Sequence, residues 1–485
     1  MASPSIAPRE WAVVFSGGLT LAFTAWAFAG VQLWSLHTLL VGCAVTFLLS
    51  IVPMPRWMNG TDGEHGNWIN LKRLLCFPVF WFSLLLTIYI TIQGFNHAWE
   101  IRSRDGRWWV EMIQSVTWLP SGVDSNYETM SAFRVLANFG AAFLLICGLW
   151  VGIRRRKSAV LVLWILVVSG SAMALVAILQ KMADADKVLW LIKSANRNPW
   201  GSFFYRNQGV AYLTMIMVGA AVLYFYHLNR SERRGQSGGP HMLLCVAIAL
   251  VYASICLALS RGGILFGGIF IGGFTIAAIG RSFLSLSMRR SLLVSLLAFS
   301  ILGSGVYGAY RLVDFEAIKK RFGDINETIE TADRDSRMIC TKITWQMAQK
   351  ELVFGWGAGS WRYIFPMYQK SHPEIFYIRY HKKKGWIGRR FYHEAHNDIV
   401  QYFFELGIVG SILFLLTFAY WVFSLAFRSS GNALSAVMLL LGMAVAFGHA
   451  FVEFIFQSPA YWIGFSGMLC ISVKLLALHA ERRYG

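Results

Sequence analysis

Residues 396–420, HNDIVQYFFELGIVGSILFLLTFAY, join a polar segment directly to a long apolar run. About twenty mostly apolar residues suffice for a helix to cross the hydrocarbon core of a membrane. Polar and ionisable side chains beside lipid are costly, so a histidine, two amides and carboxylates at the start of such a run need a function to retain them. The stretch therefore predicts a membrane-spanning helix that begins at a functional group.

The composition extends this prediction to the whole chain. Of its 485 residues, 56% are hydrophobic and only 14% are charged, whereas soluble domains average roughly 25% charged residues. The chain is therefore expected to be an integral membrane protein. Its net charge of +19 raises the possibility of a nucleic-acid partner, but the placement of the basic residues argues for membrane topology instead. The seven cysteines show neither metal-ligand spacing nor a disulfide framework.

Apolar runs long enough to span a membrane recur along the sequence. They lie near 11–30, 33–52, 74–95, 132–153, 158–180, 209–228, 241–260, 263–280, 292–312, 408–427, 433–453 and 456–478. The period-two alternation of barrel strands is absent. The runs predict an all-α integral membrane protein of about twelve transmembrane helices. Residues 1–312 would form about nine of these helices, 313–396 an external loop subdomain, and 397–485 the C-terminal helices.

The basic residues set the orientation. With the N-terminus in the cytoplasm, nearly every short cytoplasmic connection is basic, as the positive-inside rule requires; the clearest examples are Arg154–Lys157 and Arg230–Arg234. Both termini of this multi-pass protein are therefore expected inside. Three segments would then face outward, at 96–131, 181–208 and 313–396.

Three arginines fall at the predicted outer surface. Arg261 follows an apolar run directly, in Ser-Arg-Gly-Gly, Arg337 lies in the long external segment, and Arg206 precedes Asn207 at another outer edge. Each has an alternative interpretation: Arg261 and Arg206 as headgroup anchors, and Arg337 as a solvated surface charge. The glycines after Arg261 favour a closer role, because they let a ligand or backbone approach the guanidinium.

His396 is the strongest single candidate. Asn397, Gln401 and Glu405 recur every four residues after it, so they share one helical face. His393 lies outside this pattern and ranks below His396. Upstream, the glycines of Gly355–Ser360 resemble a phosphate loop, but no strand precedes them and the Walker lysine is missing. They are expected to form a plain turn.

The combination of these residues suggests a chemistry. The planar fork of arginine gives bidentate, charge-assisted bonds to phosphate. Histidine has an unperturbed pKa of roughly 6.5, which suits general-base catalysis near neutral pH. No cluster of acidic metal ligands accompanies them in the sequence. Arginines and a histidine at the outer membrane face thus predict a reaction on a lipid-linked phosphate.

The pattern His-Asn-x-x-x-Gln-x-x-x-Glu-x-Gly-x-x-Gly at 396–410 resembles the signature of the O-antigen ligase/polymerase superfamily. Further elements are similar to that family in order and rough spacing. They are Tyr205-Arg206-Asn207 before a span, Ser260–Gly263 at the end of one, the Arg337…Trp345 segment, and Gly355–Ser360. The likeness covers roughly residues 180–415, and the N-terminal third is matched by hydropathy alone. An unusually basic stretch at 379–390 departs from the family pattern.

The resemblance implies a GT-C-like glycosyltransferase of the bacterial inner membrane, with a periplasmic active site and neither metal nor cofactor. Such enzymes transfer a glycan, with inversion, from undecaprenyl pyrophosphate to a sugar hydroxyl of a lipid A-core or growing-chain acceptor. By resemblance, Arg261 and Arg337 would hold the pyrophosphate and His396 would accept the hydroxyl proton. The remaining candidates for the substrate site or its support are Arg206, Asn207, Asn397, Gln401 and Glu405.

Alternatives stay open at this point. The same chemistry would serve a polysaccharide polymerase or a protein O-oligosaccharyltransferase. The basic stretch at 379–390 suits a phosphorylated lipopolysaccharide core, and it equally suits anionic lipid headgroups. A secondary transporter is disfavoured, because the spans show no internal repeat and the polar residues collect at one surface.

Overall fold

The computed structural model describes residues 6–62, 65–194, 199–236, 238–285, 336–381, 385–428 and 432–484. The predicted span near 292–312 and residues 313–335 of the predicted external loop lie outside these ranges. Three of the basic residues of the 379–390 stretch, at 382–384, do so too.

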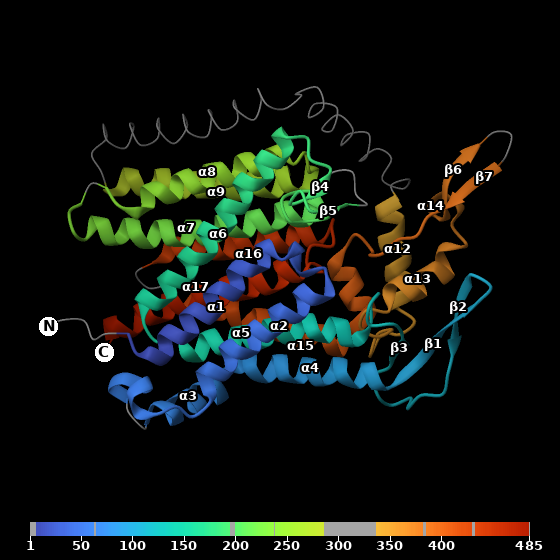
Figure 1. The fold of residues 1–485 in the computed structure, drawn as a ribbon, viewed down its shortest axis with the longest axis horizontal. Helices are drawn as coiled ribbons and strands as arrows, with labels where there is room; N and C mark the ends of the chain where they lie inside the picture. The colour runs from blue at the N-terminus through green and yellow to red at the C-terminus, as the bar shows by residue number, and fades with distance from the viewer. Residues whose placement is uncertain are drawn as a thin grey trace.

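Long helices dominate the described residues (Figure 1). They are α1 (Pro8–Trp26), α2 (Leu33–Ile51), α4 (Pro78–Phe95), α5 (Ala132–Gly152), α6 (Arg156–Met182), α7 (Arg206–Glu232), α8 (Pro240–Leu257), α9 (Arg261–Ser285), α15 (Asp398–Arg428), α16 (Ala433–Ala450) and α17 (Pro459–Tyr484). In this described part, ten helices are long and apolar enough to cross a membrane. The exception is α1, whose first turn carries Arg9 and Glu10. The prediction of a mostly helical membrane protein is confirmed at this level, whereas its count of twelve spans stays a prediction.

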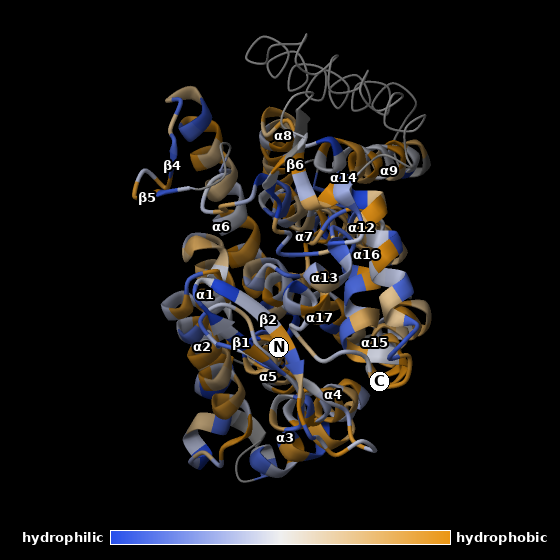
Figure 2. Cartoon of the chain, turned by 90° about the vertical axis from the view of Figure 1, so that its right-hand side faces the viewer, coloured by the Kyte–Doolittle hydropathy of each residue, from blue (hydrophilic) through white to orange (hydrophobic). Residues whose placement is uncertain are grey.

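The helices pack around two central members. α7 and α17 are almost wholly buried within the bundle, and α7 contacts α6, α8, α9, α16 and α17. α1, α2 and α5 pack on one another, and α15 packs on α4. In Figure 2 the helices carry most of the hydrophobic colour, while the connecting segments are largely hydrophilic or neutral. This distribution is what a lipid-facing bundle with polar ends requires.

Short strands and helices gather at one end of the bundle, opposite the two termini (Figure 1). They are β1 (His97–Arg104), β2 (Arg107–Met112), β3 (Gly122–Asp124), β4 (Lys187–Val188), β5 (Ile192–Lys193), α12 (Ser336–Ala348), α13 (Trp361–Gln369), α14 (Pro373–Phe376), β6 (Tyr377–His381) and β7 (Gly385–Arg389). β1 is the centre of a three-stranded sheet, antiparallel to β2 and parallel to β3. At the opposite end lie α3 (His65–Leu75) and the short helix Arg56–Asp62. The described parts of the three segments predicted to face outward therefore lie at the same end of the bundle. The strands in these segments were not predicted.

The end segments have a small core of their own. Ile343 and Met347 of α12 pack with Trp361 and Phe365 of α13 and with Phe404 of α15, all of them buried. Ile343 and Met347 are four residues apart, so they lie on one face of α12. This core fixes α12 and α13 against the first turns of α15.

A glycine-rich turn joins this core to the bundle. Gly355, Gly357 and Gly359 all have positive φ (+70°, +99° and +71°), which confirms the predicted turn. The turn lies beside a break in α15 at Gly407, where φ is +60°. The Trp356 amide donates to the Phe404 carbonyl at 2.9 Å and the Gly357 amide to the Glu405 carbonyl at 3.0 Å. The two irregular segments thus satisfy each other's backbone groups.

Replacing Gly357 by alanine is expected to destabilise the protein, because a Cβ at this position would lie 2.4 Å from the Gly122 Cα and 2.9 Å from the Ser121 carbonyl oxygen. Backbone strain of this kind costs on the order of 1–3 kcal/mol. Thermal unfolding in detergent would report the loss. The matched control is Gly140→Ala on α5, where an added Cβ meets nothing within 4 Å. Equal stability of the two variants would contradict the tight packing of the turn.

Candidate functional site

Four helices begin at the end of the bundle that carries the strands. α7 begins at Arg206, α9 at Arg261, α12 at Ser336 and α15 at Asp398. Each helix start directs unpaired backbone N–H groups and a partial positive charge toward its end. Sequence-predicted arginines lie in the first turn of three of these helices. This end of the bundle is therefore suited to an anionic group.

Glu453 lies at the meeting point of these elements. It belongs to the turn between α16 and α17, and it is only 2% exposed. Arg337 places a guanidinium nitrogen 2.7 Å from its Oε1, and the Asn207 side chain donates to the same oxygen at 2.5 Å. The Nδ1 of His396 lies 3.5 Å from Oε2. Three of the predicted residues are thus brought together on one carboxylate.

Tyr205 completes the surroundings of Glu453. Its hydroxyl donates to both carboxylate oxygens, at 3.3 and 3.2 Å. Its ring stacks on Phe454, with centroids 4.9 Å apart. Burial, with the negative charge of Glu453 beside it, raises the pKa of the Tyr205 hydroxyl. The hydroxyl therefore stays protonated and serves as a donor.

Glu453 remains ionised despite its burial. Burial alone would raise the pKa of its carboxyl, but the contact with His396 and the positive charge of Arg337 outweigh it and hold this pKa below its usual range. A buried carboxylate is stable only when it is paired and hydrogen-bonded. The three donors and the imidazole around Glu453 provide this pairing.

His396 occupies a strained position. Its backbone is left-handed, with φ at +57°, a region that non-glycine residues seldom adopt and that clusters at functional sites. Its ring lies edge-on to Phe454, with centroids 4.9 Å apart. The next residue, Asn397, accepts a hydrogen bond from the Val400 amide at 3.1 Å and so caps the start of α15. The imidazole is therefore held just before the helix.

The amide-bearing face of α15 is directed inward. Gln401 accepts from the Ala395 amide at 2.8 Å and donates to Glu394 at 2.6 Å. Glu405 accepts from the Gly359 amide at 3.0 Å. Both side chains are almost fully buried. They tie the segment before His396 and the glycine-rich turn to the helix.

Arg261 is the first residue of α9, which packs against α16, the helix that precedes Glu453. The Ser260 hydroxyl accepts from the Gly263 amide at 3.2 Å, so it caps the start of α9. Gly262 packs so closely against His449 that a Cβ there would lie 2.9 Å from its Nε2. His449 is four residues before Glu453 in the chain. The glycine after Arg261 therefore brings the start of α9 against the end of α16.

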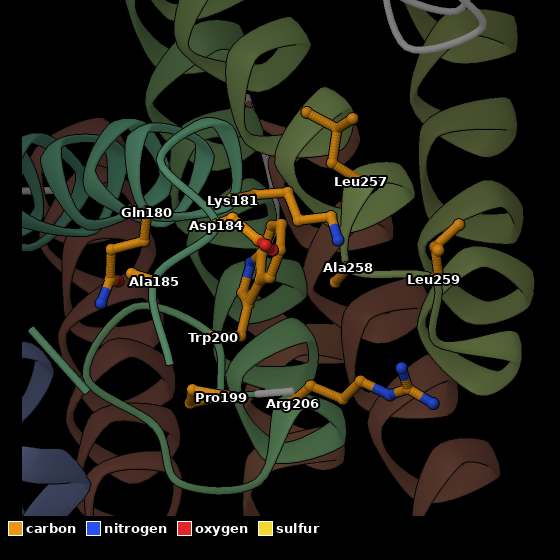
Figure 3. A pocket seen from close by; sticks show the side chains of 10 residues that line it. All are labelled: Gln180, Lys181, Asp184, Ala185, Pro199, Trp200, Arg206, Leu257, Ala258 and Leu259. Carbon is orange, nitrogen blue, oxygen red and sulfur yellow. The ribbon is translucent and has the colours of Figure 1, made fainter. Parts of the chain in front are cut away.

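Arg206 lines an open pocket beside the start of α9. Lys181 from the last turn of α6, Asp184 just after that helix, Trp200, and Leu259 from the turn before Arg261 line it too. Figure 3 shows the side chains of Lys181 and Arg206 extending to the same side of Trp200. The pocket thus presents two cationic groups and one carboxylate next to the cluster around Glu453.

Sequence reasoning missed Glu453. A signal existed, since Glu453 is a single carboxylate where the last two apolar runs meet.

Among the residues that the structure describes, no three His, Cys, Asp or Glu side chains are grouped so that they could hold a metal ion.

The comparison with known proteins bears on this part of the chain. Residues 244–415 match the model of a protein family described as O-antigen ligase. The matched segment runs from α8 into α15 and contains Arg261, Arg337 and His396, while Arg206 and Glu453 lie outside it. No curated protein sequence matches the chain. This match supports a relationship of the segment 244–415 to the O-antigen ligase superfamily of membrane glycosyltransferase-like enzymes, and the ten apolar helices agree with a membrane protein.

Proposed function

We propose that this protein transfers a glycan from undecaprenyl pyrophosphate to a sugar hydroxyl at the periplasmic face of the bacterial inner membrane. The observation that carries the proposal is the meeting of Arg337 and His396 on Glu453, beside the starts of the helices that carry Arg206 and Arg261. The cationic groups suit a pyrophosphate, and the imidazole suits proton removal from a hydroxyl.

In the proposed reaction, the acceptor hydroxyl attacks C1 of the first sugar of the donor. A new C1–O bond forms on the face opposite the leaving group, and the bond from C1 to the pyrophosphate oxygen breaks. The hydroxyl proton passes to His396. Arg261 and Arg337 stabilise the negative charge that develops on the departing undecaprenyl pyrophosphate. Asn397, Gln401 and Glu405 act by holding His396 and the glycine-rich turn, which agrees with their internal contacts.

An apolar pocket between α4, α5, α15 and α17 is suited to the polyprenyl tail. Its lining includes Phe139 and Phe143 of α5, Phe414 and Trp421 of α15, and Trp462 of α17. The pocket lies along α15, the helix that begins just after His396. A lipid tail in this pocket would extend into the bundle while its pyrophosphate stays near the helix starts.

The proposed orientation of the protein in the membrane is inferred from the positions of its basic residues. The basic residues Arg154–Lys157 and Arg230–Arg234 lie at the end of the bundle opposite the site, as do both termini. By the positive-inside rule, this distribution supports cytoplasmic termini and a periplasmic site.

The favoured acceptor is the phosphorylated lipid A-core, which makes the enzyme a ligase. Support comes from Arg389 and Arg390, which are exposed on and beside strand β7 at the same end of the bundle. An anionic acceptor complements this charge better than a neutral chain end or a protein does. A reconstituted reaction that offers lipid A-core or a second donor molecule as acceptor would separate ligase from polymerase.

Transfer is expected to continue in the presence of EDTA, because the arginines supply the positive charge that a divalent ion would otherwise provide at the leaving group. The measurement is the initial rate of glycan transfer in proteoliposomes before and after chelation. A rate within about twofold of the untreated sample is expected. A fall that added Mg²⁺ or Mn²⁺ restores would contradict the arginine-based mechanism.

A further inference from the structure

We propose that Glu453 is a positioning residue of the transfer reaction. Its carboxylate orients the His396 imidazole through Nδ1, and it holds the Arg337 guanidinium until the pyrophosphate of the donor replaces it. The inference rests on the proposed function. It adds Glu453 as the residue that positions both His396 and Arg337.

The two oxygens of Glu453 are unequally satisfied. Oε1 has short contacts with Asn207 and Arg337, at 2.5 and 2.7 Å. Among the residues that the structure describes, Oε2 has longer contacts, with the Tyr205 hydroxyl at 3.2 Å and with Nδ1 of His396 at 3.5 Å. Hydrogen bonds of catalytic groups are often long until the substrate is bound. The contact between Oε2 and Nδ1 of His396 can therefore shorten and strengthen as the imidazole gains positive charge.

This geometry decides which nitrogen of His396 can act as base. A carboxylate opposite Nδ1 favours the tautomer with its proton on Nδ1, which leaves the lone pair of Nε2 to accept the proton of the hydroxyl. When that proton arrives, the ring becomes an imidazolium with Glu453 as its counter-ion. The left-handed backbone of His396 fixes the ring in this place.

The same carboxylate restrains Arg337. Glu453 is buried and held by Asn207 and Tyr205, whereas the side chain of Arg337 is 46% exposed. When a pyrophosphate competes for the guanidinium, Arg337 is thus the partner that can move. His449, which precedes Glu453 by one turn, and Asp398, which accepts from the Phe456 amide at 2.7 Å, border the cluster on its inner side.

The test compares Glu453→Gln and Glu453→Asp with the wild type. The control is Glu232→Gln, which removes a carboxylate paired with Arg281 at the other end of α7 and α9. The readouts are kcat, KM for the donor, and binding of undecaprenyl pyrophosphate in the inactive His396→Ala background. Glutamine preserves the shape of the side chain but removes its charge.

We expect Glu453→Gln to lower kcat between about 10²- and 10⁴-fold, the scale of losing a base or its orienting carboxylate. Binding of undecaprenyl pyrophosphate should be unchanged or several-fold tighter, because Arg337 loses its internal competitor. Glu453→Asp should retain more activity than Glu453→Gln, and Glu232→Gln should match the wild type.

Two results would overturn the inference. One is a normal kcat in Glu453→Gln while His396→Ala is inactive, which leaves the proposed function standing. The other is a parallel loss of kcat, donor binding and thermal stability in both Glu453 variants, which would make the residue purely structural. If His396→Ala were itself active, the proposed function would fail first.

Discussion

Replacement of His396 by alanine is expected to reduce glycan transfer by at least about 10³-fold, at the upper part of the range for loss of a general base. Among the described side chains that contact Glu453, the imidazole of His396 has the lone pair suited to accept a proton from a neutral hydroxyl. Its loss should leave membrane insertion and donor binding intact, because the arginines remain. The measurement is the single-turnover rate with saturating donor and acceptor.

His393→Ala is the matched control. This histidine lies three residues earlier, is exposed, and contacts Phe391 rather than the cluster. Its variant is expected to transfer at the wild-type rate. Near-normal transfer by His396→Ala would remove this residue as the base and leave its strained backbone unexplained.

Arg261→Lys and Arg337→Lys are each expected to lower kcat/KM for the donor by on the order of 10²–10³, the scale of losing one transition-state donor. Lysine keeps the positive charge but cannot reproduce the bidentate fork that grips a phosphate. In Arg337→Lys the contact with Glu453 would also lose its planar geometry. The loss should be larger for transfer than for binding, because charge on the leaving group develops as the C1–O bond breaks.

Arg281→Lys serves as the control for these two variants. It lies near the other end of α9 and pairs with Glu232, so transfer should be unaffected by the change. If Arg261→Lys and Arg337→Lys both behaved like Arg281→Lys, these arginines would be lipid-headgroup anchors or surface charges, the alternatives that the sequence left open.

Much of the bundle is predictable because membrane insertion depends on local hydrophobicity. The runs at 33–52 and 132–153 correspond closely to α2 (Leu33–Ile51) and α5 (Ala132–Gly152). The apolar run at 209–228 is shorter than α7 (Arg206–Glu232). A helix can continue past the hydrocarbon core of the membrane wherever its backbone hydrogen bonds persist. The polar turns of α15 before Gly407 depend on pairing with residues 352–357, and this long-range contact leaves no signal in the hydropathy.

The candidate site, like the bundle, was only partly predictable from the sequence. Arg261 and His396 could be singled out because each borders an apolar run, where a charged or titratable group is conspicuous. Glu453 could not be assigned a role, because its partners come from elsewhere in the chain; Asn207 is 246 residues away. Only the folding of the turn between α16 and α17 against the start of α7 shows that these residues share one carboxylate.

The decisive measurement is glycan transfer by the purified protein in liposomes that contain undecaprenyl-pyrophosphate glycan and lipid A-core, with EDTA present. We predict a lipid A-core product whose new linkage has the inverted anomeric configuration, and none from His396→Ala. Failure of the wild-type protein to consume the donor with either lipid A-core or a second donor molecule as acceptor, under conditions where it binds undecaprenyl pyrophosphate, would contradict the proposed transfer.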